Sequence, residues 1–153
     1  MVILILKTIS VIVAGLMVGN ELAVGAFVHP RLSALDDKTH AASAQALARV
    51  YGAAMPIWYA AVLILTVALT LVMQPWSIAT EIAAVAAAIW LGSIVFTLVF
   101  PVPINNQVIR WDLDALPDNW KALRKQWDQF HAIRVVMLLL ALTCLTIACF
   151  IAE

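Results

Sequence analysis

Four long runs of apolar residues divide the chain. They cover residues 2–28, about 55–73, 78–100 and 132–151, and a transmembrane helix needs about 20 mostly apolar residues. None of these runs alternates between apolar and polar positions, as the strands of a membrane barrel do. The pattern therefore predicts an all-α protein in which residues 1–153 form one domain, a four-helix transmembrane bundle.

Proline and polar residues mark the ends of these runs. Pro30 follows the first run, the sequence Gln-Pro-Trp-Ser at 74–77 separates the second from the third, and Pro101 and Pro103 stop the third. Between the first two runs, Asp37–Val50 is expected to be a partly helical surface segment, capped by an aspartate. No basic residue precedes the first run, which indicates a retained helix rather than a cleaved signal peptide.

The composition agrees with a membrane protein. Hydrophobic residues make up 65% of the chain and charged residues only 12%, whereas soluble domains carry about 25% charge. The mean hydropathy is +1.01. Nine basic residues balance nine acidic ones, which argues against a nucleic-acid partner, because such a partner calls for a strongly basic face. The expected surroundings are the lipid bilayer.

The basic residues predict the orientation in the membrane. With four spans, both termini and the 74–77 turn share one side, which carries Lys7. The two long connections carry seven Lys and Arg residues: Arg31, Lys38, Arg49, Arg110, Lys121, Arg124 and Lys125. The positive-inside rule then predicts cytoplasmic connections and outer termini in the plasma (inner) membrane. The last helical pattern, Pro117–Ile151, would be about 52 Å long against roughly 30 Å of hydrocarbon, so we expect it to project into the cytoplasm.

This last helix carries the most informative polar pattern of the sequence. Its members are spaced 4, 3, 4 and 3 residues apart and fall within an arc of about 80°: Trp120, Arg124, Trp127, His131 and Arg134. Histidine acts as a general base near neutral pH, and a guanidinium stabilises a developing oxyanion. We therefore expect His131 and Arg134 to be catalytic, the alternative being that they anchor the helix at the lipid headgroups.

A second polar position lies inside the first span. Glu21 is about 10 Å from the end of this span, where a charge costs about 2.5–3.5 kcal/mol on insertion scales. It should face the bundle interior, either as part of a binding site or as a structural partner of Arg134 or an asparagine. Glu21, His29 and His131 together are the candidate ligands of a metal, although no metal-binding spacing occurs. Whether a metal or haem is bound stays open at this point.

The asparagines after Pro103 have two interpretations. They either cap a short interfacial helix, or one of them points its amide into a pocket. Spacing alone favours the cap, and Asn106 shares a helical face with Arg110. Cys144 and Cys149 lie about 140° apart on one helix, so they cannot bridge to each other and are expected to be packing residues.

The second half of the chain resembles a known family. The matching elements follow one another over about 35 residues: Phe100-Pro-Val-Pro-Ile-Asn-Asn, Arg110-Trp111, Trp120, Arg124-Lys-Gln-Trp127 and Phe130-His131-Ala-Ile-Arg134. This order is similar to the anthrone oxygenase-like membrane family, long catalogued as a domain of unknown function. The resemblance implies a four-helix membrane bundle. Some fungal members of the family take part in oxidising polyketide anthrones to anthraquinones with molecular oxygen and without a classical cofactor. The resemblance therefore implies a reaction of this kind.

Carried over by position, the resemblance adds Pro103, Asn105, Trp111 and Trp127 to His131 and Arg134. The leading hypothesis is thus a membrane oxygenase or oxidoreductase acting on a flat, lipid-soluble aromatic molecule, either anthrone-like or quinol-like. His131 would be the base, and Arg134 and Asn105 would stabilise an enolate. The candidate substrate-binding residues are Trp111, Trp127, Arg110, Asn106 and Glu21. The alternatives are a small proton-coupled transporter or channel subunit centred on Glu21 and an accessory structural membrane subunit. The oligomeric state stays open.

Overall fold

The computed structural model describes residues 1–73 and 76–152, and these contain helices and connections but no strand. The elements are α1 (Val2–Ala23), the π-helical turn η1 (Val24–Val28), α2 (His29–Leu32), α3 (Asp37–Val72), α4 (Ile78–Val99), α5 (Pro101–Val108) and α6 (Trp120–Ile151). The all-α prediction is confirmed. The predicted turn at 74–77 lies partly outside the described residues.

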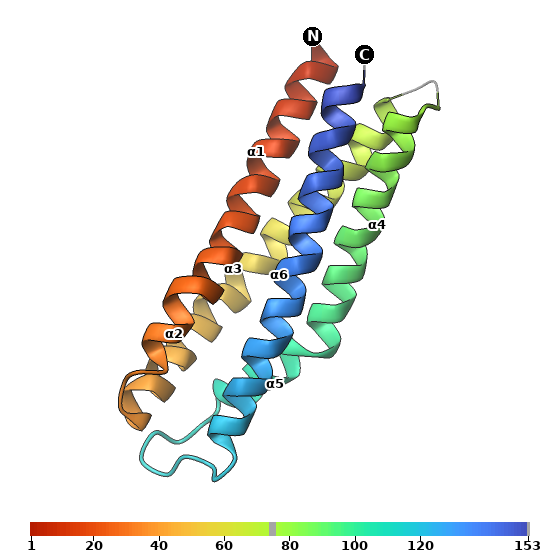
Figure 1. Cartoon of the computed structure of the whole chain (residues 1–153). Coiled ribbons are helices and arrows are strands. Elements are labelled where there is room, and N and C mark those ends of the chain that lie inside the picture. Colours follow the sequence, from red (N-terminus) through yellow and green to blue (C-terminus); the bar gives the residue numbers. More distant parts are fainter. Residues whose placement is uncertain (74–75, 153) are drawn as a thin grey trace.

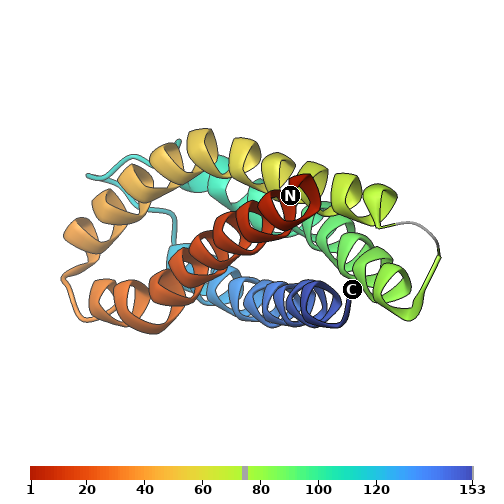
Figure 2. The ribbon, with the colours of Figure 1, turned by 90° about the horizontal axis from the view of Figure 1, so that it is seen from above.

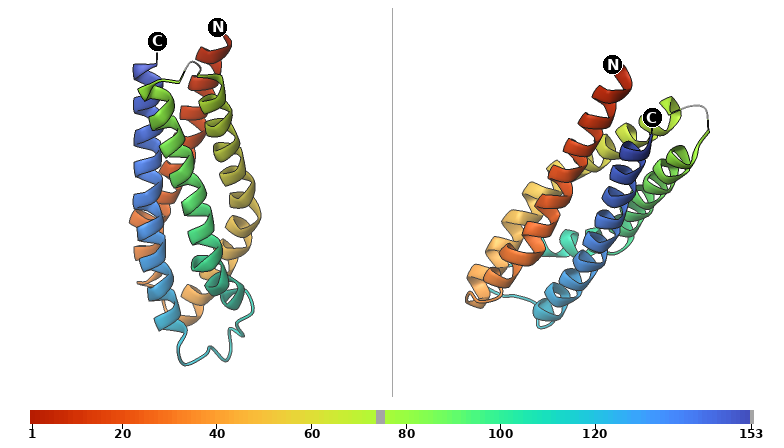
Figure 3. Two further views of the ribbon diagram at one scale, coloured as in Figure 1. Left: turned by 90° about the vertical axis from the view of Figure 1, so that its right-hand side faces the viewer. Right: turned by 45° about the horizontal axis from the view of Figure 1, so that its top comes forward.

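Four long helical segments form the bundle. Helix α1 packs against α3 and α6, and α4 packs against the same two helices, so each segment has two neighbours. Both chain ends lie at one end of the bundle, and the connections 33–36 and 109–119 lie at the other (Figures 1 and 3). We call the latter the loop end.

The four segments are long and apolar enough to cross a membrane. They are Val2–Leu32, Asp37–Val72, Ile78–Val108 and Trp120–Ile151. Large apolar side chains such as Ile57, Ile64 and Leu91 are exposed on the outside of the bundle, where lipid is the only medium that covers them without cost. The chain is a multi-pass membrane protein.

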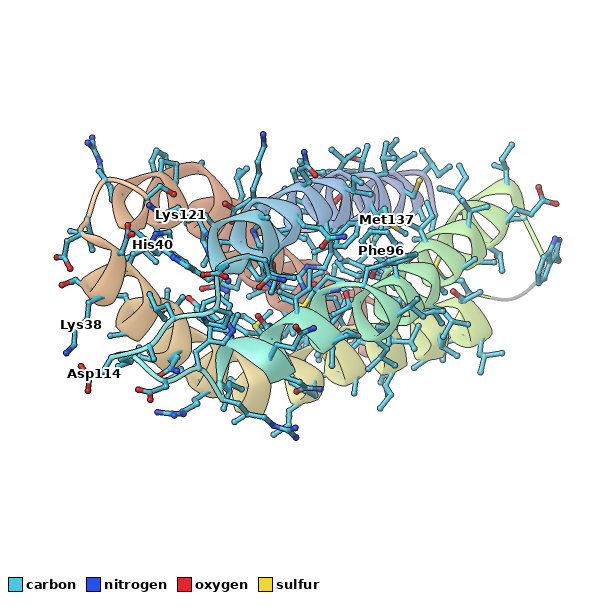
Figure 4. All side chains as sticks on the ribbon, turned by 90° about the horizontal axis from the view of Figure 1, so that it is seen from below. Lys38, His40, Phe96, Asp114, Lys121 and Met137 are labelled. Carbon is cyan, nitrogen blue, oxygen red and sulfur yellow. The ribbon has the colours of Figure 1, made fainter. Side chains whose placement is uncertain are left out.

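Small residues let the helices approach closely inside the bundle. Ala83 and Ala86 of α4 and Ala141 and Ala148 of α6 are fully buried, as expected where helices associate through van der Waals packing in lipid. Larger side chains fill the remaining space along this contact, where Figure 4 labels Phe96 and Met137. At the loop end, Phe96, Phe100 and Phe130 form a cluster with ring centroids 4.9–6.0 Å apart.

Helix α3 is longer than its apolar run, 55–73, predicted. The expected surface segment Asp37–Val50 and the second run form one helix, α3, which continues through Pro56. A buried face that includes Ala41, Ala44 and Ala48 holds the first part of α3 against the bundle. Transmembrane helices tolerate an internal proline because neighbouring groups satisfy the freed carbonyl.

Prolines expected to end helices stand instead where new helical turns begin. Pro30 occupies the first turn of α2, and Pro101 begins α5; at such positions the missing N–H is not needed. The last helix begins at Trp120, three residues after Pro117, and its 32 residues still extend about 48 Å.

Polar contacts hold the loop end together. Asp36 caps α3 by accepting the N–H of Thr39 at 3.0 Å, and this hydrogen bond lowers the pKa of the Asp36 carboxyl. Lys121 lies 2.8 Å from Asp37, and Lys38 pairs with Asp114 (Figure 4). These exposed pairs contribute little to stability by themselves.

The packing predicts that replacing two leucines on opposite sides of α6 by alanine lowers the free energy of unfolding by different amounts. Leu138 is fully buried, whereas Leu140 is 55% exposed on the lipid face. Leu138→Ala should lower the free energy of unfolding by about 2 kcal/mol, since it opens a void in the bundle. Leu140→Ala is the matched control and should cost clearly less, because lipid fills the space. Thermal unfolding in one detergent compares them, and equal losses would contradict this packing.

Candidate functional site

A cavity of about 390 Å³ lies in the half of the bundle nearest the loop end, within the size range of small-molecule sites. Its wall on α3 and α4 is mostly apolar and includes Ala48, Met55, Leu63 and Ile94. The facing wall on α1, η1, α2 and α6 is polar. Its polar and aromatic side chains include Glu21, His29, Arg124, Trp127, His131 and Arg134.

A buried ion pair joins α1 to α6 at this wall. Nη2 of Arg134 donates to Oε2 of Glu21 at 2.7 Å, and the two residues are 7% and 3% exposed. Tyr59 of α3 donates its hydroxyl to the other carboxylate oxygen at 3.2 Å. The partner that the sequence analysis required for Glu21 is therefore Arg134, and three helices meet at this carboxylate.

The contacts of His131 define its tautomer. Nε2 lies 3.0 Å from the backbone carbonyl of Glu21, which only accepts, so Nε2 carries the hydrogen. Nδ1 then presents a lone pair, and Nη2 of Arg134 donates to it at 2.8 Å. Oε2 of Glu21 is 3.3 Å from the same nitrogen. Both nitrogens of this imidazole are engaged by the protein.

The backbone of the π-helical turn η1 lies close to the ring of His131. The π-helical turn η1 follows Glu21 by three residues, and such widened turns occur often at functional sites. Gly25 lies in this turn, where a Cβ atom would be only 3.1 Å from Cδ2 and Nε2 of His131. A side chain at this position would therefore press on the ring.

A second set of the same composition lies one turn closer to the loop end. Nδ1 of His29 is 2.8 Å from Oδ1 of Asp128 and 3.1 Å from Nη2 of Arg124. Each histidine thus faces one carboxylate and one guanidinium. Asp128 and Tyr59 cannot be assigned from the sequence, because neither belongs to a recognisable spacing and each meets its partner only across a helix contact.

Trp127 links the two sets. Its ring stacks on His29 and on His131, with centroids 4.6 and 4.8 Å apart, and the guanidinium of Arg124 lies 4.8 Å from it. Among the described residues, three buried N–H groups of this wall have no acceptor: Nε of Arg124, Nε1 of Trp127 and Nε of Arg134. Buried donors without partners are costly, which favours a ligand that carries acceptor oxygens.

The structure brings together only part of the expected site. Glu21, His29, Asn105, Trp127, His131 and Arg134 all line the cavity. Asn106 and Arg110 are exposed and lie away from it. Trp111 is buried instead against Trp120, with centroids 6.2 Å apart.

The asparagines do not cap a helix, because α5 begins at Pro101 and both lie inside it. Adjacent residues on a helix point about 100° apart. Asn105 consequently reaches the cavity while Asn106 turns to the surface.

The candidate metal ligands are only partly gathered. Within residues 1–73 and 76–152, no three His, Cys, Asp or Glu side chains are grouped so that they would hold a metal ion. Glu21 and His131 are close, but the guanidinium of Arg134 contacts both of them. This cation occupies the position that a metal ion would need.

Comparison with known proteins gives one result. The sequence model of the family described as "Anthrone oxygenase" matches residues 47–144. This stretch contains Asn105, Arg124, Trp127, His131 and Arg134. No curated protein and no solved structure matches the chain. With most of its length matched and four membrane-crossing helices, the chain belongs to the anthrone oxygenase family and is an oxygenase-like membrane protein.

Proposed function

We propose that the protein is a membrane oxygenase whose substrate is a flat, lipid-soluble aromatic ketone of the anthrone type, bound in the cavity. The observation that carries this proposal is the division of the cavity walls. One wall is apolar, and the other holds two imidazoles, two guanidiniums and an indole. A flat apolar ring with an oxygen substituent is complementary to both walls.

The first chemical step is removal of a proton from the methylene carbon of the substrate. His131 is the base, and the lone pair on its Nδ1 accepts a hydrogen bond from Arg134 in the resting site. When the substrate oxygen draws this guanidinium away, Nδ1 is released to take the proton, and Oε2 of Glu21 at 3.3 Å stabilises the imidazolium. Arg134 and Asn105 then hold the enolate oxygen by hydrogen bonds.

Molecular oxygen is the second substrate. The carbanion supplies the electrons, oxygen adds to the carbon, and loss of water completes the conversion of the methylene to a carbonyl. One molecule of ketone and one of oxygen therefore give one quinone and one water. Carbanions stabilised over several rings react with oxygen directly, so this scheme uses groups of the protein alone.

The substrate enters from the bilayer in this proposal. Several lining residues are also exposed on the outside of the bundle, namely Gly52, Pro56, Ala60 and Leu98. The gap between α3 and α4 that they border is a route for an apolar molecule dissolved in lipid. For the orientation, we infer from the basic residues that the loop end is cytoplasmic.

Oxygen uptake tests the proposal. The purified protein in detergent should consume one molecule of oxygen for each molecule of unsubstituted anthrone, and it should form anthraquinone faster than a sample without protein. Absence of this acceleration would contradict an oxygenase. A proton-coupled transporter predicts instead substrate flux into liposomes that is lost in Glu21→Gln, with no oxygen consumed.

Gly25→Ala should impair this activity without unfolding the protein. The new Cβ would lie 3.1 Å from the imidazole of His131 and displace it by a few tenths of an ångström. Misplacement by 1 Å can cost about 10²-fold, so we expect turnover to fall on the order of tenfold. Gly15→Ala is the control, because nothing lies within 4 Å of its Cβ position. Equal turnover in both variants would show that the position of His131 is unimportant.

A further inference from the structure

The proposed reaction removes two protons from the same carbon. The first removal gives the carbanion that reacts with oxygen, and protonation of the product gives a hydroperoxide that still carries one C–H bond. The second removal breaks this bond while the O–O bond cleaves. A site that catalyses the whole reaction needs either one base for each proton removal or a single base that gives up the first proton before it takes the second.

His29 has the arrangement of a general base. A distance of 2.8 Å between its Nδ1 and Oδ1 of Asp128 requires a hydrogen between the two atoms, because a carboxylate does not supply one. Nη2 of Arg124, which would need an acceptor, lies farther from Nδ1, at 3.1 Å. The shorter contact therefore assigns the hydrogen to Nδ1 and the lone pair to Nε2. Within the described residues, Nε2 of His29 makes no hydrogen bond.

The two imidazoles of the cavity are thus in complementary states. His131 donates from Nε2 and has its lone pair covered by Arg134, whereas His29 donates from Nδ1 to Asp128 and keeps its lone pair free. A carboxylate that receives Nδ1–H fixes the tautomer and stabilises the imidazolium that forms when Nε2 takes a proton. Arg124 lies 3.7 Å from the same carboxylate oxygen and holds it in place.

The two imidazole rings are close enough for one bound molecule to contact both. The centroids of His29 and His131 are 5.8 Å apart, which is less than the length of a three-ring aromatic, and both line the same cavity. His29 and His131 also border a second hollow of about 440 Å³, which Asp128 and Ser33 line as well. The carboxylate of Asp128 is 40% exposed there, so this set is in contact with the surroundings of the bundle.

We propose that His29 is a second catalytic residue, with Asp128 as its positioning residue, and that it removes the second proton; this assignment rests on the proposed function. Nε2 takes the remaining proton of the hydroperoxide carbon. The electron pair of the C–H bond becomes the second bond of the new carbonyl, the O–O bond breaks, and hydroxide leaves. The imidazolium returns its proton to the hydroxide, which gives water and restores the base.

The test separates the two halves of the reaction. Oxygen uptake reports the first half, anthraquinone reports the second, and iodide oxidation reports accumulated hydroperoxide. Anthrone is the probe, in mildly acidic buffer, where uncatalysed loss of water is slow. In His29→Gln and Asp128→Asn, hydroperoxide should accumulate, because oxygen still adds to the carbanion while the second proton removal is slowed. Quinone formed per oxygen should fall at least tenfold, since a general base contributes about 10²–10⁴-fold.

Three controls make the result decisive. Asp118→Asn changes an exposed carboxylate near the beginning of α6 and should leave the ratio of quinone to oxygen unchanged. Asp128→Glu should restore most of this ratio, which a purely structural role would not predict. With deuterium at the reacting carbon, the isotope effect on quinone formation should increase in Asp128→Asn.

Three outcomes decide between the proposals. An unchanged ratio in His29→Gln and Asp128→Asn would overturn the second base. Joint loss of oxygen uptake and quinone in folded variants would overturn it as well, because His29 would then act in the first half. Failure of the unmodified protein to consume oxygen would instead refute the proposed function itself.

Discussion

Arg134→Met is expected to destabilise the protein by about 3–5 kcal/mol, because it leaves the carboxylate of Glu21 buried without its cation. The methionine retains most of the volume of the side chain, so the loss reports the charge rather than a void. The ion pair is 2.7 Å long and its two side chains are 9% and 4% exposed. The measurement is unfolding in detergent, followed by loss of helical signal against temperature or denaturant.

Two controls identify the cause of this loss. The double variant Glu21→Gln with Arg134→Met removes both charges and should recover a large part of the lost stability, so that the two changes are strongly non-additive. Lys121→Met breaks an ion pair of nearly the same length, 2.8 Å, whose side chains are 68% and 58% exposed. It should have only a small effect. If Arg134→Met and Lys121→Met cost the same, burial of the Glu21–Arg134 pair does not matter to the fold.

His131→Ala should reduce both oxygen uptake and quinone formation by about 10²–10⁴-fold, the usual contribution of a general base. Both readouts fall because the variant lacks the base for the first proton removal, in contrast to the variants of His29, which are blocked later. The protein should remain folded, since Glu21 and Arg134 keep their mutual contact. Oxygen electrode and absorbance traces of one reaction provide the two rates.

His40→Ala is the matched control for this change. His40 is also buried, at 9% exposure, but it packs edge-on against Trp120, with centroids 5.3 Å apart, and does not line the cavity. Its replacement should leave both rates near those of the unmodified protein. Full activity of His131→Ala would remove His131 from the mechanism.

The sequence predicted those parts of the site that one helix carries. Trp127, His131 and Arg134 share a face because of the helical period alone, and the same period places them on the cavity wall of α6. The cost of burying a charge further predicted that Glu21 faces inward and that Arg134 is among its candidate partners. Both arguments are local or energetic, and neither requires the tertiary arrangement.

Contacts between distant segments could not be predicted from the sequence pattern. His29 and Asp128 are 99 positions apart, and Tyr59 and Glu21 are 38 apart. No spacing along the chain therefore predicts either contact. The continuation of the first helical segment through Pro30 also changes the role of His29. Just after the first apolar run it was only a candidate metal ligand, whereas at the start of α2 it stacks on Trp127 beside the carboxylate of Asp128.

The shared position of the two chain ends has a practical consequence. Lys7 of α1 donates to the backbone carbonyl of Ala152, just beyond α6, at 2.7 Å. The two chain ends lie at the same end of the bundle (Figure 1). A reporter enzyme or fluorescent tag fused to either end must therefore face the same compartment, and an engineered protease site in 109–119 must face the opposite one. If the loop end is cytoplasmic, an alkaline phosphatase fusion at either end is active, and a fluorescent protein that matures only in the cytoplasm stays dark.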